Sequence, residues 1–363
     1  MQVMAHTYRS LGEIDKADPL MQQVVEIQDT LSIPLAEKAE AYNIRGLILR
    51  DKGDFDEAEK AMDQAVTLFQ KAGESDTEEY SKLLADLAYV KRINANYDEA
   101  LSMVQEAINI KENIHNRTHL QLAEPYYILA SILRKQDNYE QAKINQFKSL
   151  DILQANINGP HPGKANNFNN LAIIYKEQDS LVKAGEHYQR SLAMSEKLYG
   201  PSHPEIVTVS SNFSNILLKQ GKINSAKTMI KRALQITRNE LGKTHPTMGQ
   251  HLSDYAYIFR SKKQYSKADS LYDQALHILK KHYPDNHPRI VGVLHNKAEN
   301  AYRSGQIEQA ETLFRKVLSI RTERYDSSSE DIQIPLQQLL DILESKGNIQ
   351  EADSLRNIFS STQ

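Results

Sequence analysis

Basic side chains recur along the sequence at a nearly constant interval. Six of them stand 41, 42 or 84 residues apart: Arg9, Arg50, Arg92, Arg134, Lys176 and Arg260. Leu218 interrupts this series, and Tyr302 and Glu344 end it. Guanidinium and ammonium groups bind carboxylates and phosphates through charge-assisted hydrogen bonds. These six residues, called the basic ladder below, therefore predict a surface that receives an acidic or phosphorylated segment.

Uncharged polar and aromatic residues accompany the ladder at helical spacing. They stand seven or three residues before a ladder position, so that all three positions share one helix face. Asparagine can both donate and accept hydrogen bonds, which suits the backbone of an extended peptide. The residues predicted to form a peptide-binding groove are Arg50, Arg92, Arg134, Lys176, Arg260, Asn43, Tyr89, Tyr127, Asn169, Asn215 and Tyr257.

A second explanation of the ladder stays open at this point. Each basic residue falls in the last turn of a predicted helix, where a cation gains typically 0.3–1 kcal/mol from the helix dipole. That gain alone would favour arginine and lysine at these positions. Six basic residues in seven successive units exceed such a bias, and we therefore favour the groove.

The elements that position these residues follow from a recurring alanine. It stands at intervals of 41 or 42 residues, each time after a short polar turn: Ala17, Ala58, Ala100, Ala142, Ala184, Ala226, Ala268, Ala310 and Ala352. A small residue lies twelve positions before each of the first eight alanines, which lets two helices approach closely. Such a period predicts an all-α, right-handed α-solenoid of nine helix–turn–helix units.

The motifs of the units resemble those of tetratricopeptide repeats of the 42-residue kinesin-light-chain type. Examples are Asn169-Asn170-Leu171-Ala172, Tyr188-Gln189-Arg190-Ser191-Leu192 and Leu198-Tyr199-Gly200-Pro201-Ser202-His203-Pro204. The resemblance covers the whole chain in period and residues 158–325 in detail. It implies that the ladder face lines a concave surface. It also implies a protein-interaction scaffold. The alternative is a regulatory or docking arm of a larger bacterial signalling enzyme, such as a serine/threonine kinase or a CHAT-type protease.

The repeats also predict the organisation of the chain. Residues 1–325 form units one to eight, and residues 326–363 form a divergent C-terminal capping unit that begins with the linker Asp326–Glu330. Ala5 occupies the middle of the first helix although only four residues precede it, so we expect this helix to be truncated.

Composition excludes several classes of function. The 44 basic and 47 acidic residues give a net charge of -3, which favours neither nucleic acid nor membrane as a partner. Cysteine is absent from the sequence, which removes disulfides and thiolate sites. The sequence shows no signal peptide and no apolar run of membrane-spanning length. We expect a cytoplasmic monomer or weak oligomer with a protein or peptide partner.

The histidines and the remaining motifs predict neither a metal site nor catalysis. His119, His161, His203, His245 and His287 recur every 42 residues. Packed helices are roughly 8–10 Å apart, whereas zinc needs its nitrogen ligands at about 2 Å. These histidines are therefore expected to cap helices. The Gly242-Lys243-Thr244 segment lacks the upstream glycine of a phosphate-binding loop. We expect no enzyme, no cofactor and no small-molecule substrate.

Overall fold

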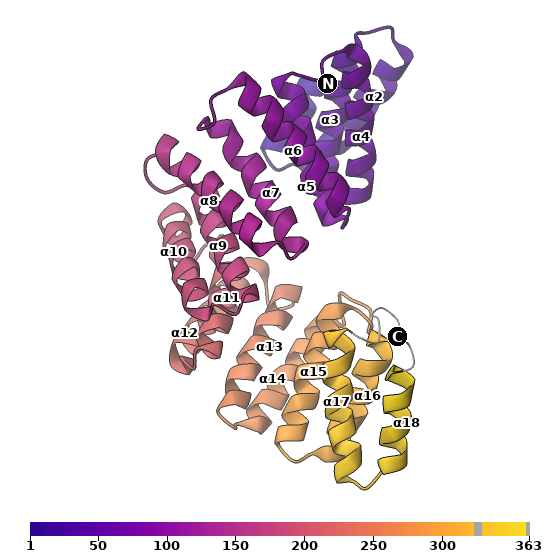
Figure 1. Cartoon of the computed structure of the whole chain (residues 1–363), viewed down its shortest axis with the longest axis vertical. Helices are drawn as coiled ribbons and strands as arrows, with labels where there is room; N and C mark the ends of the chain where they lie inside the picture. The colour runs from indigo at the N-terminus through magenta and orange to yellow at the C-terminus, as the bar shows by residue number, and fades with distance from the viewer. Residues whose placement is uncertain (323–328, 361–363) are drawn as a thin grey trace. The chain divides into compact units, whose positions relative to one another are not determined.

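A computed structural model describes residues 1–322 and 329–360, apart from the side chains of Glu330 and Ser360. All regular structure in these residues is helical, with eighteen α-helices in nine consecutive pairs (Figure 1). This confirms the predicted all-α repeat solenoid. The right-handed superhelix and a separate capping unit stay predictions. The linker Asp326–Ser328 and the tail Ser361–Gln363 lie outside the described residues.

The chain divides into two compact units, 1–194 and 195–363, and the division falls within α10. The helices of the first unit are α1 (Gln2–Ser10), α2 (Ile14–Thr30), α3 (Leu35–Lys52), α4 (Phe55–Ala72), α5 (Glu78–Ile93), α6 (Tyr97–Ile114), the short 3₁₀ helix η1 (Leu120–Leu122), α7 (Ala123–Lys135), α8 (Tyr139–Asn156), α9 (Pro162–Glu177) and α10 (Leu181–Tyr199).

The second unit repeats the same arrangement. Its helices are α11 (Glu205–Lys219), α12 (Ile223–Ile236), the π-helical turn η2 (Thr237–Leu241), α13 (Pro246–Ser261), α14 (Tyr265–Leu279), α15 (Pro288–Arg303), α16 (Ile307–Arg321), α17 (Glu330–Ser345) and α18 (Ile349–Ser360).

The recurring alanines mark the contact between the two helices of each pair. All nine are completely buried. The small residues twelve positions earlier are buried as well, and a Cβ atom on Gly46 would lie 2.5 Å from Met62 Cγ. The hydroxyl of Ser214 instead donates to the carbonyl of Ala226 at 3.0 Å. Close approach of the paired helices therefore explains why small residues recur at both positions.

The turn between the two helices of a pair has a backbone feature that recurs along the chain. Five residues before each key alanine, the backbone adopts a positive φ angle in all nine described pairs. Glycine occupies this position in five of the pairs, as at Gly53 (φ 89°). Ala95, Asp137, Asp179 and Lys263 adopt a positive φ of 55–65° there without the conformational freedom of glycine. The polar turn seen in the sequence therefore ends the first helix of each pair at a residue in the left-handed backbone conformation.

The recurring histidines cap helices, as the sequence predicts. In each case the Nδ1 atom of the histidine accepts a hydrogen bond from the backbone N–H two residues later: His119, His161, His203, His245 and His287, at 3.1–3.4 Å. An aromatic or histidine ring four residues earlier stacks on three of them, for example Tyr283 on His287 at 4.0 Å. The hydrogen bonds to the histidine Nδ1 atoms satisfy backbone N–H groups that the first turn of a helix leaves without a partner.

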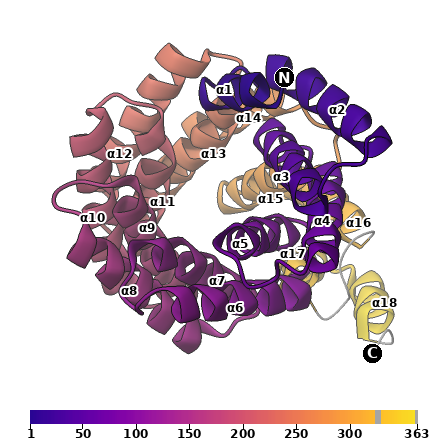
Figure 2. The same cartoon turned by 90° about the horizontal axis from the view of Figure 1, so that it is seen from above.

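The first helix of each pair lies on one side of its unit. In the first unit α3, α5, α7 and α9 form one side of the row, and α4, α6, α8 and α10 form the other (Figure 2). Successive first helices contact each other in both units, as α3 contacts α5 and α11 contacts α13. The surface that they share carries the ladder positions and is called the first-helix face below.

Candidate functional site

Four of the six ladder residues are ion-paired with a carboxylate of the following repeat. The pairs are Arg9–Asp51 (2.7 Å), Arg50–Asp86 (2.6 Å), Arg134–Glu177 (2.8 Å) and Arg260–Glu299 (2.7 Å). These arginine side chains are only 6–21% exposed. The ladder therefore joins neighbouring repeats, a role that the sequence analysis missed. The signal was present in the carboxylates that follow each arginine by 36 to 43 residues.

Two ladder residues keep an unbalanced charge. Neither Arg92 nor Lys176 forms an ion pair within the part of the chain that the structure describes. The Arg92 guanidinium lies 4.9 Å from the centre of the Tyr89 ring, and its buried Nε has no hydrogen-bond partner there. Lys176 is exposed at the end of α9. These two cations are the ladder residues that can still neutralise a ligand.

Two of the three predicted tyrosines, Tyr89 and Tyr257, lie against ladder arginines. Tyr89 lies between Arg50 and Arg92, with the guanidinium carbons 5.9 and 4.9 Å from its ring centre. In the second unit the guanidinium of Arg260 lies 4.5 Å from the ring of Tyr257. Spacing of three residues along one helix brings each ring beside the arginine of its own helix. Arg50 and Arg260 already have carboxylate partners, so Arg92 is the arginine that the ring of Tyr89 orients for a planar carboxylate or phosphate of a ligand.

Buried polar atoms without partners concentrate on the first-helix face. Sixteen such side-chain atoms occur among the described residues. Five of them belong to the ladder position or to the position seven residues earlier: Asn43 Oδ1, Arg92 Nε, Arg134 Nε, Asn169 Oδ1 and His295 Nδ1. These five atoms lie on five different first helices, α3, α5, α7, α9 and α15. Buried polar groups normally find partners, and a face that lacks them is ready to bind a hydrogen-bonding ligand.

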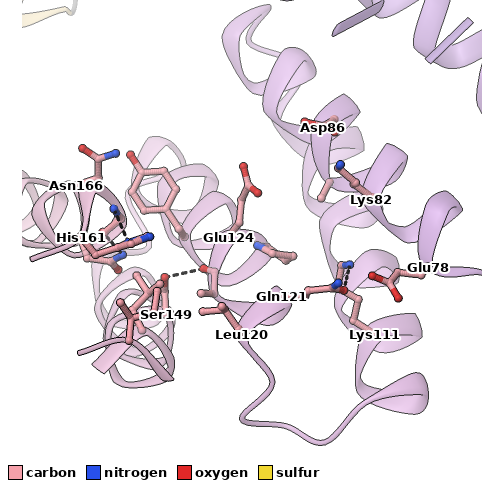
Figure 3. A pocket seen from close by; sticks show the side chains of 18 residues that line it. Glu78, Lys82, Asp86, Lys111, Leu120, Gln121, Glu124, Ser149, His161 and Asn166 are labelled. Carbon is pink, nitrogen blue, oxygen red and sulfur yellow. Dashed lines mark hydrogen bonds between the residues drawn. The ribbon is translucent and has the colours of Figure 1, made fainter. Parts of the chain in front are cut away.

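A pocket of about 510 Å³ opens beside this face in the first unit. Lys82 and Asp86 on one side and His161 and Asn166 on the other face the same space, with Glu124 between them (Figure 3). Tyr127, a predicted groove residue, also lines it, and burial raises the pKa of its hydroxyl. The pocket holds charges of both signs, so it selects for shape and hydrogen bonding more than for net charge.

A second pocket, of about 390 Å³, lies in the second unit and includes the predicted residue Asn215. The Ser211 hydroxyl donates to Asp254 Oδ2 at 2.9 Å and lies 3.1 Å from His251 Nδ1. Burial raises the pKa of Asp254 to about 6 and lowers that of His251 to about 4. At neutral pH the pocket therefore holds a neutral imidazole beside a carboxylate. Sequence analysis identified Asn215 but not Asp254.

The remaining predicted residues, Asn43, Asn169 and the others named above, lie outside these two pockets. The described residues hold no group of three or more histidine, aspartate or glutamate side chains that could bind a metal ion. Over the same residues, none of the helices combines the length and apolar character that crossing a membrane requires.

Paired helices stacked in tandem define a helical repeat solenoid, and arrays of this class present extended surfaces for other proteins. The tetratricopeptide repeat family profile matches residues 1–30, 37–155 and 165–281, which is more than half of the chain. The chain therefore belongs to the tetratricopeptide repeat family. No match was found among curated protein sequences.

The solved structures to which this chain is similar share little sequence with it. The apo form of the quorum sensor NprR from B. thuringiensis is 12% identical, with a TM-score of 0.68 over 88% of this chain and 86% of that one. The apo form of RapI is 18% identical, with a TM-score of 0.61 over 78% and 98%. Repeats of a putative kinesin light chain from Podosopora anserina are 20% identical, with a TM-score of 0.48 over 57% and 99%.

Proposed function

We propose that this protein is a non-catalytic scaffold that binds peptide segments of partner proteins on the first-helix face of its first unit. The observation that carries the proposal is a set of four buried, unpartnered polar atoms on that face, which belong to Asn43, Arg92, Arg134 and Asn169. Asn43 and Asn169 would bind the peptide backbone through their side-chain amides. A bound peptide would remove the cost of leaving these atoms unsatisfied.

The charge of the ligand follows from the ladder residues that remain unpaired. Arg50 and Arg134 already neutralise Asp86 and Glu177, so they add little net attraction. Arg92 and Lys176 retain their charge, and they stand two repeats apart on α5 and α9. An acidic or phosphorylated segment that follows the first-helix face would neutralise both cations.

Selection from a random peptide display library on the immobilised full chain tests this proposal. We expect the recovered peptides to be enriched in aspartate and glutamate, and a matching phosphopeptide to bind as well or better. Recovered peptides without acidic enrichment would contradict the proposed ligand. The same peptides are then displaced with an excess of either the parent chain or the variant with Arg92→Gln and Lys176→Gln. Equal displacement by the two chains would contradict the proposed site.

A further inference from the structure

The gap in the basic ladder at Leu218 leaves one partly buried carboxylate, that of Asp254, without a cation partner. In the first unit, Arg50 pairs at 2.6 Å with Asp86, which follows it by 36 residues. Asp254 follows Leu218 by the same 36 residues. Asp86 and Asp254 thus occupy equivalent positions in their repeats, fourteen residues before the key alanine. The repeat position that holds the partner arginine of Asp86 is therefore occupied by the uncharged Leu218 in the repeat before Asp254.

No other described cation takes the place of that arginine. Asp254 accepts hydrogen bonds from the Ser211 hydroxyl at 2.9 Å and from the Gln250 side chain, and these donors are neutral. Arg289 lines the same pocket, but its Nη1 donates to the Tyr283 hydroxyl at 3.1 Å and its guanidinium lies 5.6 Å from that ring. The pocket therefore contains a carboxylate that no cation of the described chain neutralises.

Other side chains of the pocket can accept hydrogen bonds from a bound donor. The pocket walls carry oxygen acceptors on the side chains of Thr208, Asn212, Asn215 and Thr247. His251 also lines it and is 3% exposed, and its buried Nε2 has no hydrogen-bond partner among the described residues. Its volume of about 390 Å³ is large enough for a long side chain and lies near the lower end of the range of small-molecule pockets.

We propose that this pocket binds the guanidinium group of an arginine side chain from a partner peptide, which pairs with Asp254 as Arg50 pairs with Asp86. Guanidinium fits better than ammonium because its planar fork binds a carboxylate and offers further N–H groups to the surrounding oxygen atoms. The site lies in the second unit and takes the opposite charge from Arg92 and Lys176. It is therefore independent of the proposed acidic ligand, and either site can exist without the other.

The raised pKa of Asp254 is the direction expected for a carboxylate without a neighbouring cation. Burial raises it to about 6, so the carboxylate is mostly ionised at neutral pH although its surroundings disfavour the charge. A bound guanidinium would lower this pKa and remove the penalty.

The test uses the full chain and a blocked arginine, Nα-acetyl-arginine methylamide, as the probe. Its neutral isostere, blocked citrulline, serves as the matched ligand control. NMR titration of the isotope-labelled protein at pH 7.5 should give saturable shifts in α11 and α13 with blocked arginine, at a dissociation constant on the order of 1 mM. Blocked citrulline should bind at least about tenfold more weakly.

Three variants assign the binding to this pocket. Asp254→Asn keeps the shape and removes the charge, so binding of blocked arginine should fall about tenfold or more. Leu218→Arg restores the ladder residue and should block the probe by occupying the pocket from within the chain. Asp353→Asn, on the exposed surface of α18, should leave binding unchanged. Equal binding of arginine and citrulline, full binding by either pocket variant, or no saturable shift at all would overturn the proposal.

Discussion

Replacing Asp254 by asparagine should stabilise the protein at neutral pH. The substitution keeps the side-chain volume and can keep the hydrogen bond from Ser211, which the Asp254 carboxylate accepts at 2.9 Å. It removes a charge that the described structure leaves unpaired in the second-unit pocket. Most substitutions of a hydrogen-bonded, partly buried residue destabilise a protein, so a gain would be specific to this unneutralised carboxylate.

The size of the effect follows from the pKa of Asp254. Burial raises it from 3.8 to about 6, so the folded protein binds the proton more tightly than the unfolded chain does. Stability from this group is fully present below pH 3.8 and is lost as the pH rises through about 6. Two pKa units correspond to about 3 kcal/mol as an upper limit. Because solvent reaches the pocket, we expect about 1–2 kcal/mol at pH 7.5.

Urea denaturation followed by circular dichroism measures this difference at pH 7.5 and again near pH 4. The asparagine variant should be more stable at pH 7.5, and the two proteins should converge in acid, where Asp254 is protonated. Burial lowers the pKa values of His251 and His295 to about 4, so both proteins lose stability below pH 6.5, and this loss cancels in the comparison.

A repeat array need not unfold in one step, so hydrogen exchange in α11 and α13 at pH 7.5 provides a local measurement of the same free energy. An asparagine variant that is less stable at pH 7.5, or a difference that does not change with pH, would refute the reasoning.

Three further changes test the packing, each by thermal and urea denaturation. Gly46→Ala should destabilise the protein, because the new Cβ atom would lie 2.5 Å from Met62 Cγ. Gly292→Ala should stabilise it by about 0.5–1 kcal/mol, because the new Cβ atom meets no atom within 4 Å. The opposite order of stabilities would contradict the assigned helix contacts. Ala95→Gly should stabilise by up to about 1 kcal/mol because Ala95 adopts a φ of 65°, and a loss would show that this turn is not strained. Ala184→Leu should cost about 1–3 kcal/mol by overpacking a fully buried contact, and an unchanged melting temperature would argue against it.

The repeat fold could be predicted from the sequence because its signal is periodic. A small residue at a helix contact recurs whenever the same contact recurs, so nine buried alanines identify the helix pairs before any coordinate is known. The histidine caps follow in the same way from their fixed place before a helix start. Each of these features depends on residues close together in the chain.

The state of the candidate site was less predictable, because it depends on pairing between repeats. The ladder arginines were found by their spacing, but the carboxylates that neutralise them stand at several different spacings, as Asp51, Asp86 and Glu177 show. Which carboxylate a long arginine side chain reaches is decided by how successive first helices pack. Asp254 could be recognised as part of a candidate site only from the Arg50–Asp86 ion pair, because Leu218 stands where the arginine of that pair would be.

The most direct test of the proposed scaffold is the affinity of one selected acidic peptide for three forms of the full chain. These are the parent, the variant with Arg92→Gln and Lys176→Gln, and a control with Lys71→Gln and Lys148→Gln, which removes two exposed cations from the second helices α4 and α8. The variant with Arg92→Gln and Lys176→Gln should bind the peptide at least about tenfold more weakly, and its affinity should depend less on salt. The control should bind like the parent. Equal affinity of the variant with Arg92→Gln and Lys176→Gln and the parent, or a loss in the control alone, would contradict the assignment of peptide binding to the first-helix face.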